Sequence, residues 1–136
     1  LDLFSGVGSF GLECLSREAK TVTFFENYSK VLPILKKNIF NLGYEKKTNI
    51  IQSDLFNKEA LINLKNKFDI IFIDPPYKEK NLSELINNLD QSSILNSKSV
   101  IIIHRHKKEK DIFPKKFKTL IERSYGISKI TFGMFY

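Results

Sequence analysis

The segment Asp74-Pro75-Pro76-Tyr77 places hydrogen-bond acceptors and an aromatic ring on a stiff backbone. Two consecutive prolines fix φ twice, remove two N–H donors and hold the residue before each of them extended, so the carbonyls are exposed. The Asp74 carboxylate and the Pro75 carbonyl can accept hydrogen bonds from a target amine and orient its lone pair, while Tyr77 can stack on a flat base. This combination predicts methyl transfer to an amine, promoted by alignment more than by a strong general base. The alternative is a two-proline turn without chemistry.

A glycine loop near the start of the chain is a second feature typical of a ligand site. Residues 1–11 (LDLFSGVGSFG) predict a strand, a glycine turn and a helix, and Gly6 and Gly8 let the backbone turn sharply and lie close to a ligand. The next strand ends in Glu26, where an acidic side chain can accept two hydrogen bonds from the hydroxyls of a ribose. Asp2 lies four residues before Gly6, a position that suits the positively charged amino acid half of S-adenosylmethionine.

Two other interpretations of the glycine loop remain open. The spacing of Gly6, Gly8 and Gly11 also matches the dinucleotide fingerprint, which predicts NAD binding. In that fingerprint, however, the strand runs almost straight into its first glycine, whereas here Asp2 lies well before Gly6. NAD enzymes also have no need of the two-proline motif. The remaining alternative is a glycine turn that only packs a helix on a strand.

Asp54 follows the third expected strand, in the segment Ser53-Asp54-Leu55-Phe56. Its carboxylate can accept a hydrogen bond from the amino group of adenine, with Leu55 or Phe56 packed on the ring. Taken alone, an aspartate at this place is more typical of the N-cap of a helix over residues 55–64. Its position after Glu26, in the same strand order, favours the ligand interpretation.

Short apolar runs alternate with helical patterns along the chain, which is typical of a parallel α/β sheet. Near-continuous apolar character, as in residues 70–73 and 100–103, predicts strands buried on both faces. With a terminal hairpin turning at residues 124–126, these runs predict a Rossmann-like, doubly wound, seven-stranded sheet, mostly parallel with an antiparallel C-terminal hairpin. The expected strands are residues 1–4, 21–25, 48–51, 69–73, 99–103, 118–123 and 127–136, and the expected helices are residues 9–16, 29–42, 58–64 and 82–89.

Composition limits the classes of function. The chain has 136 residues, 42% of them hydrophobic, so we expect one catalytic domain over residues 1–136. We also expect a further segment before Leu1, because the chain opens inside an expected strand. No apolar run approaches the roughly 20 residues of a membrane span. The single cysteine, Cys14, fits the core of a cytoplasmic protein. The net charge of +7 favours a polyanion such as RNA or DNA, and a biased genome explains it equally well.

Together these residues resemble the class I methyltransferases, and residues 2–17 (DLFSGVGSFGLECLSR) resemble the first motif of the bacterial RsmD family. The resemblance covers nearly the whole chain and continues through residues 25–27, 35–38, 68–77 and 125–136. It implies the cofactor S-adenosyl-L-methionine and methylation of the N2 amine of a guanine in 16S ribosomal RNA, free or in an assembling 30S subunit. Two departures are Glu18, where the family commonly has glycine, and the lack of a counterpart to the family's basic N-terminal segment.

The resemblance also implies roles for individual residues. The methionine part of the cofactor would be held by Asp2, Gly6 and Gly8, the ribose by Glu26 and the adenine by Asp54. Chemistry on a stacked base requires that the base be flipped out of its stack, and the catalytic residues that would hold it are Asp74, Pro75, Pro76 and Tyr77. The full set implied to bind the cofactor is Asp2, Phe4, Gly6, Gly8, Glu26, Asn27, Asp54, Leu55 and Asp74.

Other functions remain open at this point. Methylation of adenine N6 in DNA or RNA, or of a protein glutamine, uses the same chemistry, although the glutamine enzymes usually have Asn at the position of Asp74. A non-catalytic RNA-binding assembly factor with the same fold is a further alternative. Residues 105–110 and 115–118 are equally consistent with contacts to RNA phosphates and with a solvated loop. His104 and His106 lack the additional ligands of a metal site, so we expect no metal. We also expect a monomer.

Overall fold

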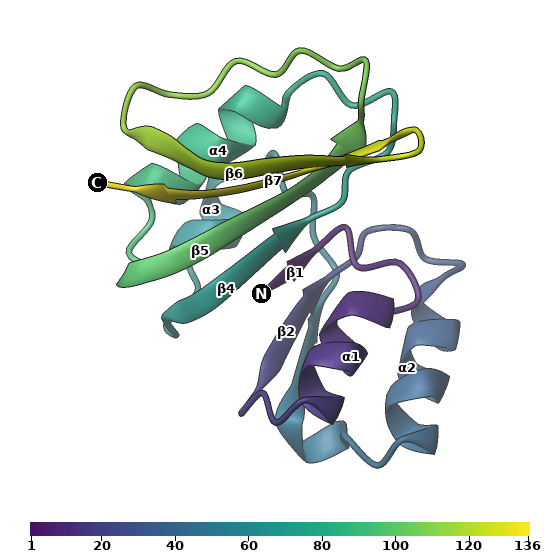
Figure 1. The fold of residues 1–136 in the computed structure, drawn as a ribbon. Helices are drawn as coiled ribbons and strands as arrows, with labels where there is room; N and C mark the ends of the chain where they lie inside the picture. Colours follow the sequence, from purple (N-terminus) through teal and green to yellow (C-terminus); the bar gives the residue numbers. More distant parts are fainter. The chain divides into compact units, whose positions relative to one another are not determined.

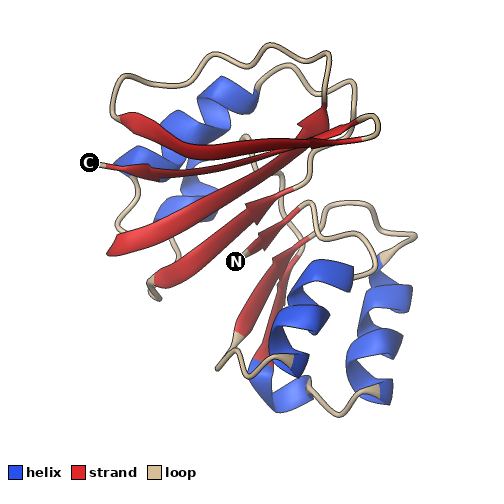
Figure 2. Cartoon of the chain, in the orientation of Figure 1, coloured by secondary structure: helices blue, strands red, loops and turns tan.

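The computed structural model describes residues 1–136, apart from the side chain of Lys58. These residues form two units, Leu1–Asp54 and Leu55–Tyr136, each built of strands with helices packed on them (Figure 1; Figure 2). Among the described residues, no helix is long and apolar enough to cross a membrane.

The N-terminal unit alternates short strands with helices, as the apolar pattern predicts. Its elements are β1 (Asp2–Leu3), α1 (Ser9–Ser16), β2 (Val22–Phe25), α2 (Leu32–Asn41), the 3-10 helix η1 (Glu45–Lys47) and β3 (Thr48–Ile51). The strands pair in parallel, in the order β3-β2-β1. All four side chains of β2 are buried, as expected for a strand covered on both faces.

Helices α1 and α2 pack on β2 through a common core of Leu12, Leu15, Val22, Phe24, Leu35 and Ile39. The approach is close at Gly11, where a Cβ would lie 2.3 Å from Cε1 of Phe24, so only glycine allows α1 to lie so near the strand. Cys14 is partly buried and packs against this core, and burial raises the pKa of its thiol. The thiol therefore behaves as a small apolar side chain, close to the prediction for Cys14.

Helix α2, predicted over residues 29–42, begins later than the periodicity indicates, at Leu32. Pro33 lies in its first turn, where the missing N–H breaks no hydrogen bond. One more turn of helix before Leu32 would place the proline in the interior, where its ring clashes with a preceding carbonyl. The proline therefore sets the start of this helix.

The C-terminal unit contains α3 (Lys58–Ile62), β4 (Phe68–Ile73), α4 (Leu82–Gln91), β5 (Leu95–His106), β6 (Phe117–Tyr125) and β7 (Ser128–Phe135). Its strands are ordered β4-β5-β7-β6, with β4 and β5 parallel and the pairs of β7 antiparallel. Figure 1 shows α3 and α4 on one face of these strands. The core includes Ile71, Ile73, Ile101 and Ile103 of the sheet and Leu82, Leu85, Ile86 and Leu89 of α4, all at most 1% exposed.

The turn of the terminal hairpin begins two residues later than predicted and ends one residue later. Tyr125 pairs with Ser128, so the turn consists of Gly126 and Ile127 and not of residues 124–126. Gly126 has φ +57°, a conformation that favours glycine at a hairpin turn. With this adjustment the predicted fold class is confirmed, because the strands belong to a seven-stranded sheet that is mostly parallel and ends in antiparallel strands.

Candidate active site

The glycine loop of the N-terminal unit has an unusual backbone. Phe4, Gly6 and Gly8 have φ of +60°, +54° and +87°, in the left-handed region that a non-glycine residue such as Phe4 adopts at some energetic cost. The hydroxyl of Ser5 is buried without a hydrogen-bond partner among the described residues. The loop therefore carries a polar atom that the protein itself does not use, which fits a polar ligand.

The two loop glycines have different surroundings. A Cβ at Gly8 would lie 2.5 Å from Cδ1 of Leu35 and 3.3 Å from the ring of Phe24, so Gly8 is needed for packing on the core. A Cβ at Gly6 would meet nothing within 4 Å. The open space at Gly6 is where a ligand can approach the backbone, as the sequence suggested for both positions.

Glu26 fastens the loop to the end of β2. Its Oε2 accepts a hydrogen bond from the backbone N of Gly6 and its Oε1 accepts one from the backbone N of Tyr28, each at 2.7 Å. Every carboxylate oxygen has a second lone pair, and Glu26 is only partly buried. The side chain can therefore hold the loop and still accept hydrogen bonds from ribose hydroxyls, and the first of these roles was not predicted. Asn27, the next residue, is exposed.

Asp2 lies beneath the loop and is 1% exposed. Its Oδ2 accepts a hydrogen bond from the backbone N of Gly11 at 3.0 Å, within the first turn of α1. A carboxylate at this place interacts favourably with the positive end of the helix. The structure thus gives Asp2 a part in holding the glycine loop against α1, which the sequence did not predict.

Glu18 explains one departure from the family pattern. It follows Arg17, the C-cap of α1, and has φ +72°. This left-handed conformation is the one that glycine adopts freely after a helix, which accounts for the family's preference for glycine. Glu18 adopts the same backbone shape at a cost of order 1 kcal/mol.

Asp54 is not the N-cap of a helix. Helix α3 begins at Lys58, and its N-cap is Asn57, whose side chain accepts a hydrogen bond from the backbone N of Glu59 at 3.1 Å. The N-cap interpretation of Asp54 is therefore wrong, because the helix starts three residues later than that alternative requires. Asp54 is exposed, whereas Leu55 is 4% exposed.

The two-proline segment follows β4 directly, and strand pairing gives Asp74 its neighbour. Ile73 of β4 is paired with Ile103 of β5, so the next residues, Asp74 and His104, also lie side by side. Nδ1 of His104 is 2.7 Å from Oδ1 of Asp74, and Nε2 of His104 is 2.9 Å from Oγ of Ser128 at the start of β7. The side chain of Asp74 is 46% exposed, so it remains accessible to a substrate.

Tyr77 has a second histidine beside it. The ring of His106 lies 6.0 Å from that of Tyr77, edge to face, an arrangement that aromatic rings prefer. Nδ1 of His106 accepts a hydrogen bond from the backbone N of Lys108 at 3.1 Å. Tyr77 itself is 59% exposed, which leaves its face available to a flat base.

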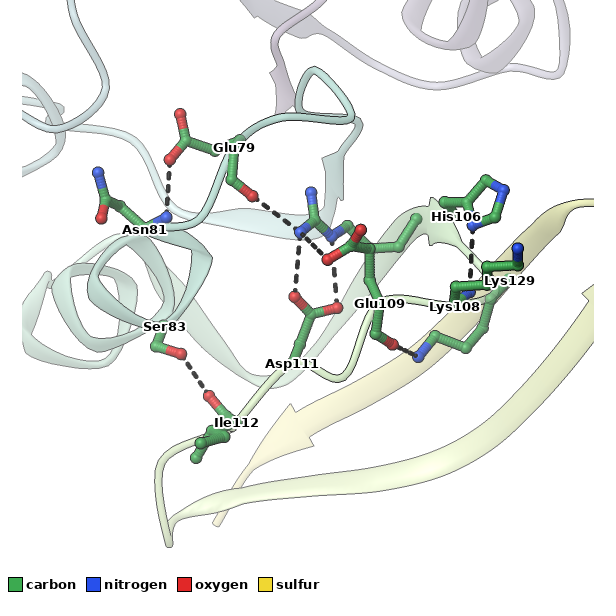
Figure 3. Close-up of polar contacts among 10 residues, drawn as sticks. Glu79, Asn81, Ser83, His106, Lys108, Glu109, Asp111, Ile112 and Lys129 are labelled. Carbon is green, nitrogen blue, oxygen red and sulfur yellow. Dashed lines mark hydrogen bonds and ion pairs between the residues drawn. The ribbon is translucent and has the colours of Figure 1, made fainter.

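Arg105, between the two histidines, is buried and links the loop after β4 to the loop after β5. It is 4% exposed, and its Nη2 donates to the carbonyl of Glu79 at 2.8 Å, just after the two-proline segment. Nη2 lies 3.2 Å from Oδ1 of Asp111, and Nε donates to Oδ2 of Asp111 at 3.3 Å (Figure 3). Glu109 lies further away, at 3.7 Å. Arg105 therefore has a structural role, and its proposed contact with RNA phosphates is wrong.

The last residues of β5 thus contact the two-proline segment and the residues that follow it. The sequence did not predict these contacts. The strand was predicted to end at residue 103, and it continues to His106 because it pairs with β7 as far as Ser128. The local sequence carries no signal for this extension: residues 100–103 are all apolar and residues 104–108 are all polar or charged, so the alternating burial along β5 is seen only in the structure. The three residues after Ile103 each contact a different residue of the segment 74–79.

Comparison with known proteins places these features in a family. A family model described as Conserved hypothetical protein 95 matches residues 1–134. Ribosomal RNA small subunit methyltransferase D of Haemophilus influenzae is 35% identical over 132 residues, which are 93% of this chain and 66% of that protein. The protein of the same name from Buchnera aphidicola subsp. Acyrthosiphon pisum is 39% identical over 119 residues, 85% of this chain and 59% of that protein. The chain therefore spans less than two thirds of these relatives.

Solved structures agree on the fold. A putative methylase from Haemophilus influenzae is 31% identical, with a TM-score of 0.83, over 97% of this chain and 84% of that chain. A putative methyltransferase complexed with SAH is 17% identical, with a TM-score of 0.80, over 97% of this chain and 43% of that chain. The second likeness concerns the fold alone, and both show the fold of class I methyltransferases.

Proposed function

The chain belongs to the RsmD family, and we propose that it transfers a methyl group from S-adenosyl-L-methionine to the exocyclic N2 amine of a guanine in 16S ribosomal RNA. The observation that carries the proposal is the exposed pair of Asp74 and Tyr77 after the end of β4, each in contact with a histidine of β5. An acceptor and an aromatic ring at a rigid strand end are what a planar base with an amino group requires.

The N-terminal unit would bind the cofactor, which supplies the methyl group on a positively charged sulfur. Glu26 would accept hydrogen bonds from the ribose hydroxyls with the lone pairs that Gly6 and Tyr28 leave unused. The open space at Gly6 and the unpaired hydroxyl of Ser5 suit the polar groups of the methionine part. Asp2 adds negative charge beneath the loop. The remaining proposed contacts are those of Phe4, Gly8, Asn27, Asp54, Leu55 and Asp74.

The segment 74–77 would bind the target. The carboxylate of Asp74 and the carbonyl of Pro75 accept hydrogen bonds from the amine and turn its lone pair toward the methyl group, while Tyr77 stacks on the base and Pro76 keeps the segment stiff. A base in this position has left its helical stack. Because the leaving group is good, these residues contribute mainly by alignment.

The direct test uses tritiated S-adenosyl-L-methionine, the full-length protein, and either naked 16S ribosomal RNA or 30S particles lacking their methylation. Nucleoside analysis of the product should show labelled N2-methylguanosine. Label in N6-methyladenosine or in protein would replace the proposed target by another amine. Binding of NADH in place of the cofactor would overturn the methyl-transfer proposal. Comparing naked RNA with particles shows which of them is the substrate. We propose that the protein acts as a monomer in the cytoplasm, on 16S ribosomal RNA that is either free or in an assembling 30S subunit.

Substitution Glu26→Gln should weaken binding of S-adenosylhomocysteine by about 10- to 100-fold, since a hydrogen bond to a charged group contributes about 1.5–3 kcal/mol. The amide nitrogen of glutamine cannot accept from a backbone N–H, so one of the two hydrogen bonds from the backbone N of Gly6 and of Tyr28 is lost as well. Isothermal titration calorimetry measures the change. Glu13→Gln is the matched control, because Glu13 forms an exposed pair with Arg17 on the surface of α1. Equal affinities of the two variants would contradict the role of Glu26.

Exposed lysines next to the two-proline segment should contact RNA phosphates. Lys107 and Lys108 are exposed and directly follow His106, which touches Tyr77. Replacing both by alanine should weaken RNA binding and lower the slope of log affinity against log salt by about 0.7 for each lost contact. The matched control replaces Lys36 and Lys37, an exposed pair on α2, with the same change of net charge. A filter-binding salt titration with equal slopes for both double variants would refute the contact.

A further inference from the structure

Resting on the proposed function, we propose that His104 is a positioning residue that fixes the carboxylate of Asp74 for the target amine. The contact is set by the sheet, because Asp74 and His104 follow the paired residues Ile73 and Ile103 of two parallel strands. The distance of 2.7 Å between Nδ1 of His104 and Oδ1 of Asp74 is that of a strong hydrogen bond.

The two partners of His104 determine where its ring carries hydrogen. An ionised carboxylate only accepts hydrogen bonds, so Nδ1 must be the donor to Asp74. In the neutral ring Nε2 then has a lone pair, which accepts from the hydroxyl of Ser128 at 2.9 Å. Held at both nitrogens, between the end of β4 and the start of β7, the ring cannot rotate without losing a hydrogen bond.

The consequence for the reaction concerns the second oxygen of Asp74. Oδ1 of Asp74 is engaged by His104, so Oδ2 is left to accept a hydrogen bond from the amine. The side chain of Asp74 is 46% exposed and that of His104 is 23% exposed, so Asp74 is the more accessible of the two. An aspartate fixed in this way has lost its rotational freedom before the substrate binds, so less entropy is lost when the amine is aligned. His104 therefore acts through Asp74 and does not touch the substrate.

Two amide substitutions at the same position separate this role from a general structural one. The side-chain nitrogen of asparagine can occupy the place of Nδ1 and donate to Asp74, whereas that of glutamine can occupy only the place of Nε2, beside Ser128. We expect His104→Asn to retain most of kcat and His104→Gln to lose about 10- to 100-fold, the usual effect of losing a residue that orients a functional group. The affinity for S-adenosylhomocysteine should be the same in both.

A second measurement is independent of catalysis. The chain has two histidines, so long-range proton–nitrogen NMR spectra are simple to assign, with His104→Asn identifying the signals of His104. At a pH of about 8.5, above the usual titration range of histidine, His104 should be protonated at Nδ1, and Asp74→Ala should abolish this preference. A ring protonated at Nε2 in the wild type would overturn the proposal.

The two measurements also distinguish this proposal from the proposed function. If the wild type methylates RNA and His104→Gln is as active as His104→Asn, the positioning role is refuted and the methyltransferase proposal stands. Equal loss in both variants, with the fold intact, refutes it too, because a donor at Nδ1 would then make no difference. If the wild type methylates no RNA, the proposed function fails, and protonation at Nδ1 that depends on Asp74 still supports the contact itself.

Discussion

Replacing Asp74 by alanine is expected to lower kcat for methyl transfer by about 10²- to 10³-fold, the range found when one preorganised polar group is removed from an active site. The substitution deletes the side-chain acceptor proposed to orient the target amine and leaves the Pro75 carbonyl as the other proposed acceptor. Because Asp74 is 46% exposed, its loss leaves no buried cavity, and the free energy of unfolding should change little. Single-turnover rates at saturating cofactor measure the step itself.

The amide variant Asp74→Asn refines this expectation. Its side-chain oxygen can still accept from the amine, but its nitrogen would then face Nδ1 of His104, and the ring must move its hydrogen to Nε2 to accept from it. We therefore expect a rate between those of the wild type and Asp74→Ala. Asp69→Ala is the matched control, since Asp69 belongs to β4, the strand before Asp74, and its side chain accepts a hydrogen bond from Asn96 at 2.7 Å. A rate for Asp74→Ala within about threefold of the control would refute the role of Asp74.

The sequence was sufficient where local chemistry determines structure. The glycine loop, the strand before the two prolines and the order of the elements follow from turn residues and apolar runs. The predicted burial of that strand on both faces is wrong, because Ile70 is 45% exposed. Even the departure at Glu18 has a local reason, the left-handed backbone at the end of α1. These features depend on residues close together in the chain, so a pattern over a short window is enough to predict them.

The parts that the sequence did not reveal depend on pairing between distant strands. The run Arg105-His106-Lys107-Lys108 is polar and charged, the composition of a solvated loop. Its first two residues, Arg105 and His106, belong to β5 because they pair with β7, more than twenty residues later in the chain. That pairing brings His104 to Ser128 and carries Arg105 into the interior. Neither contact has a signature in the local composition, and the support of the two-proline segment was therefore missed.

Arg105→Met is expected to lower the free energy of unfolding by about 3–5 kcal/mol, because it leaves the carboxylate of Asp111 buried without its counter-ion. The side chains of Arg105 and Asp111 are 3% and 9% exposed, and the guanidinium binds both carboxylate oxygens as well as the carbonyl of Glu79. Denaturation in urea, extrapolated to water, measures the change. Arg17→Met is the control: the Arg17–Glu13 pair is shorter, at 2.7 Å, but 77% and 58% exposed, so its loss should cost less than about 1 kcal/mol.

The double variant Arg105→Met with Asp111→Leu shows whether the cost comes from the unpaired charge. Two apolar side chains of similar size remove both charges together, so the double variant should be more stable than either single variant, with a coupling energy of about 1–3 kcal/mol. The carbonyl of Glu79 still loses its donor, so some destabilisation should remain, and the segment 74–79 should lose its link to the loop that follows β5. Additive effects of the two substitutions would show that Arg105 contributes through its hydrogen bond to the carbonyl of Glu79 and not through its ion pair with Asp111.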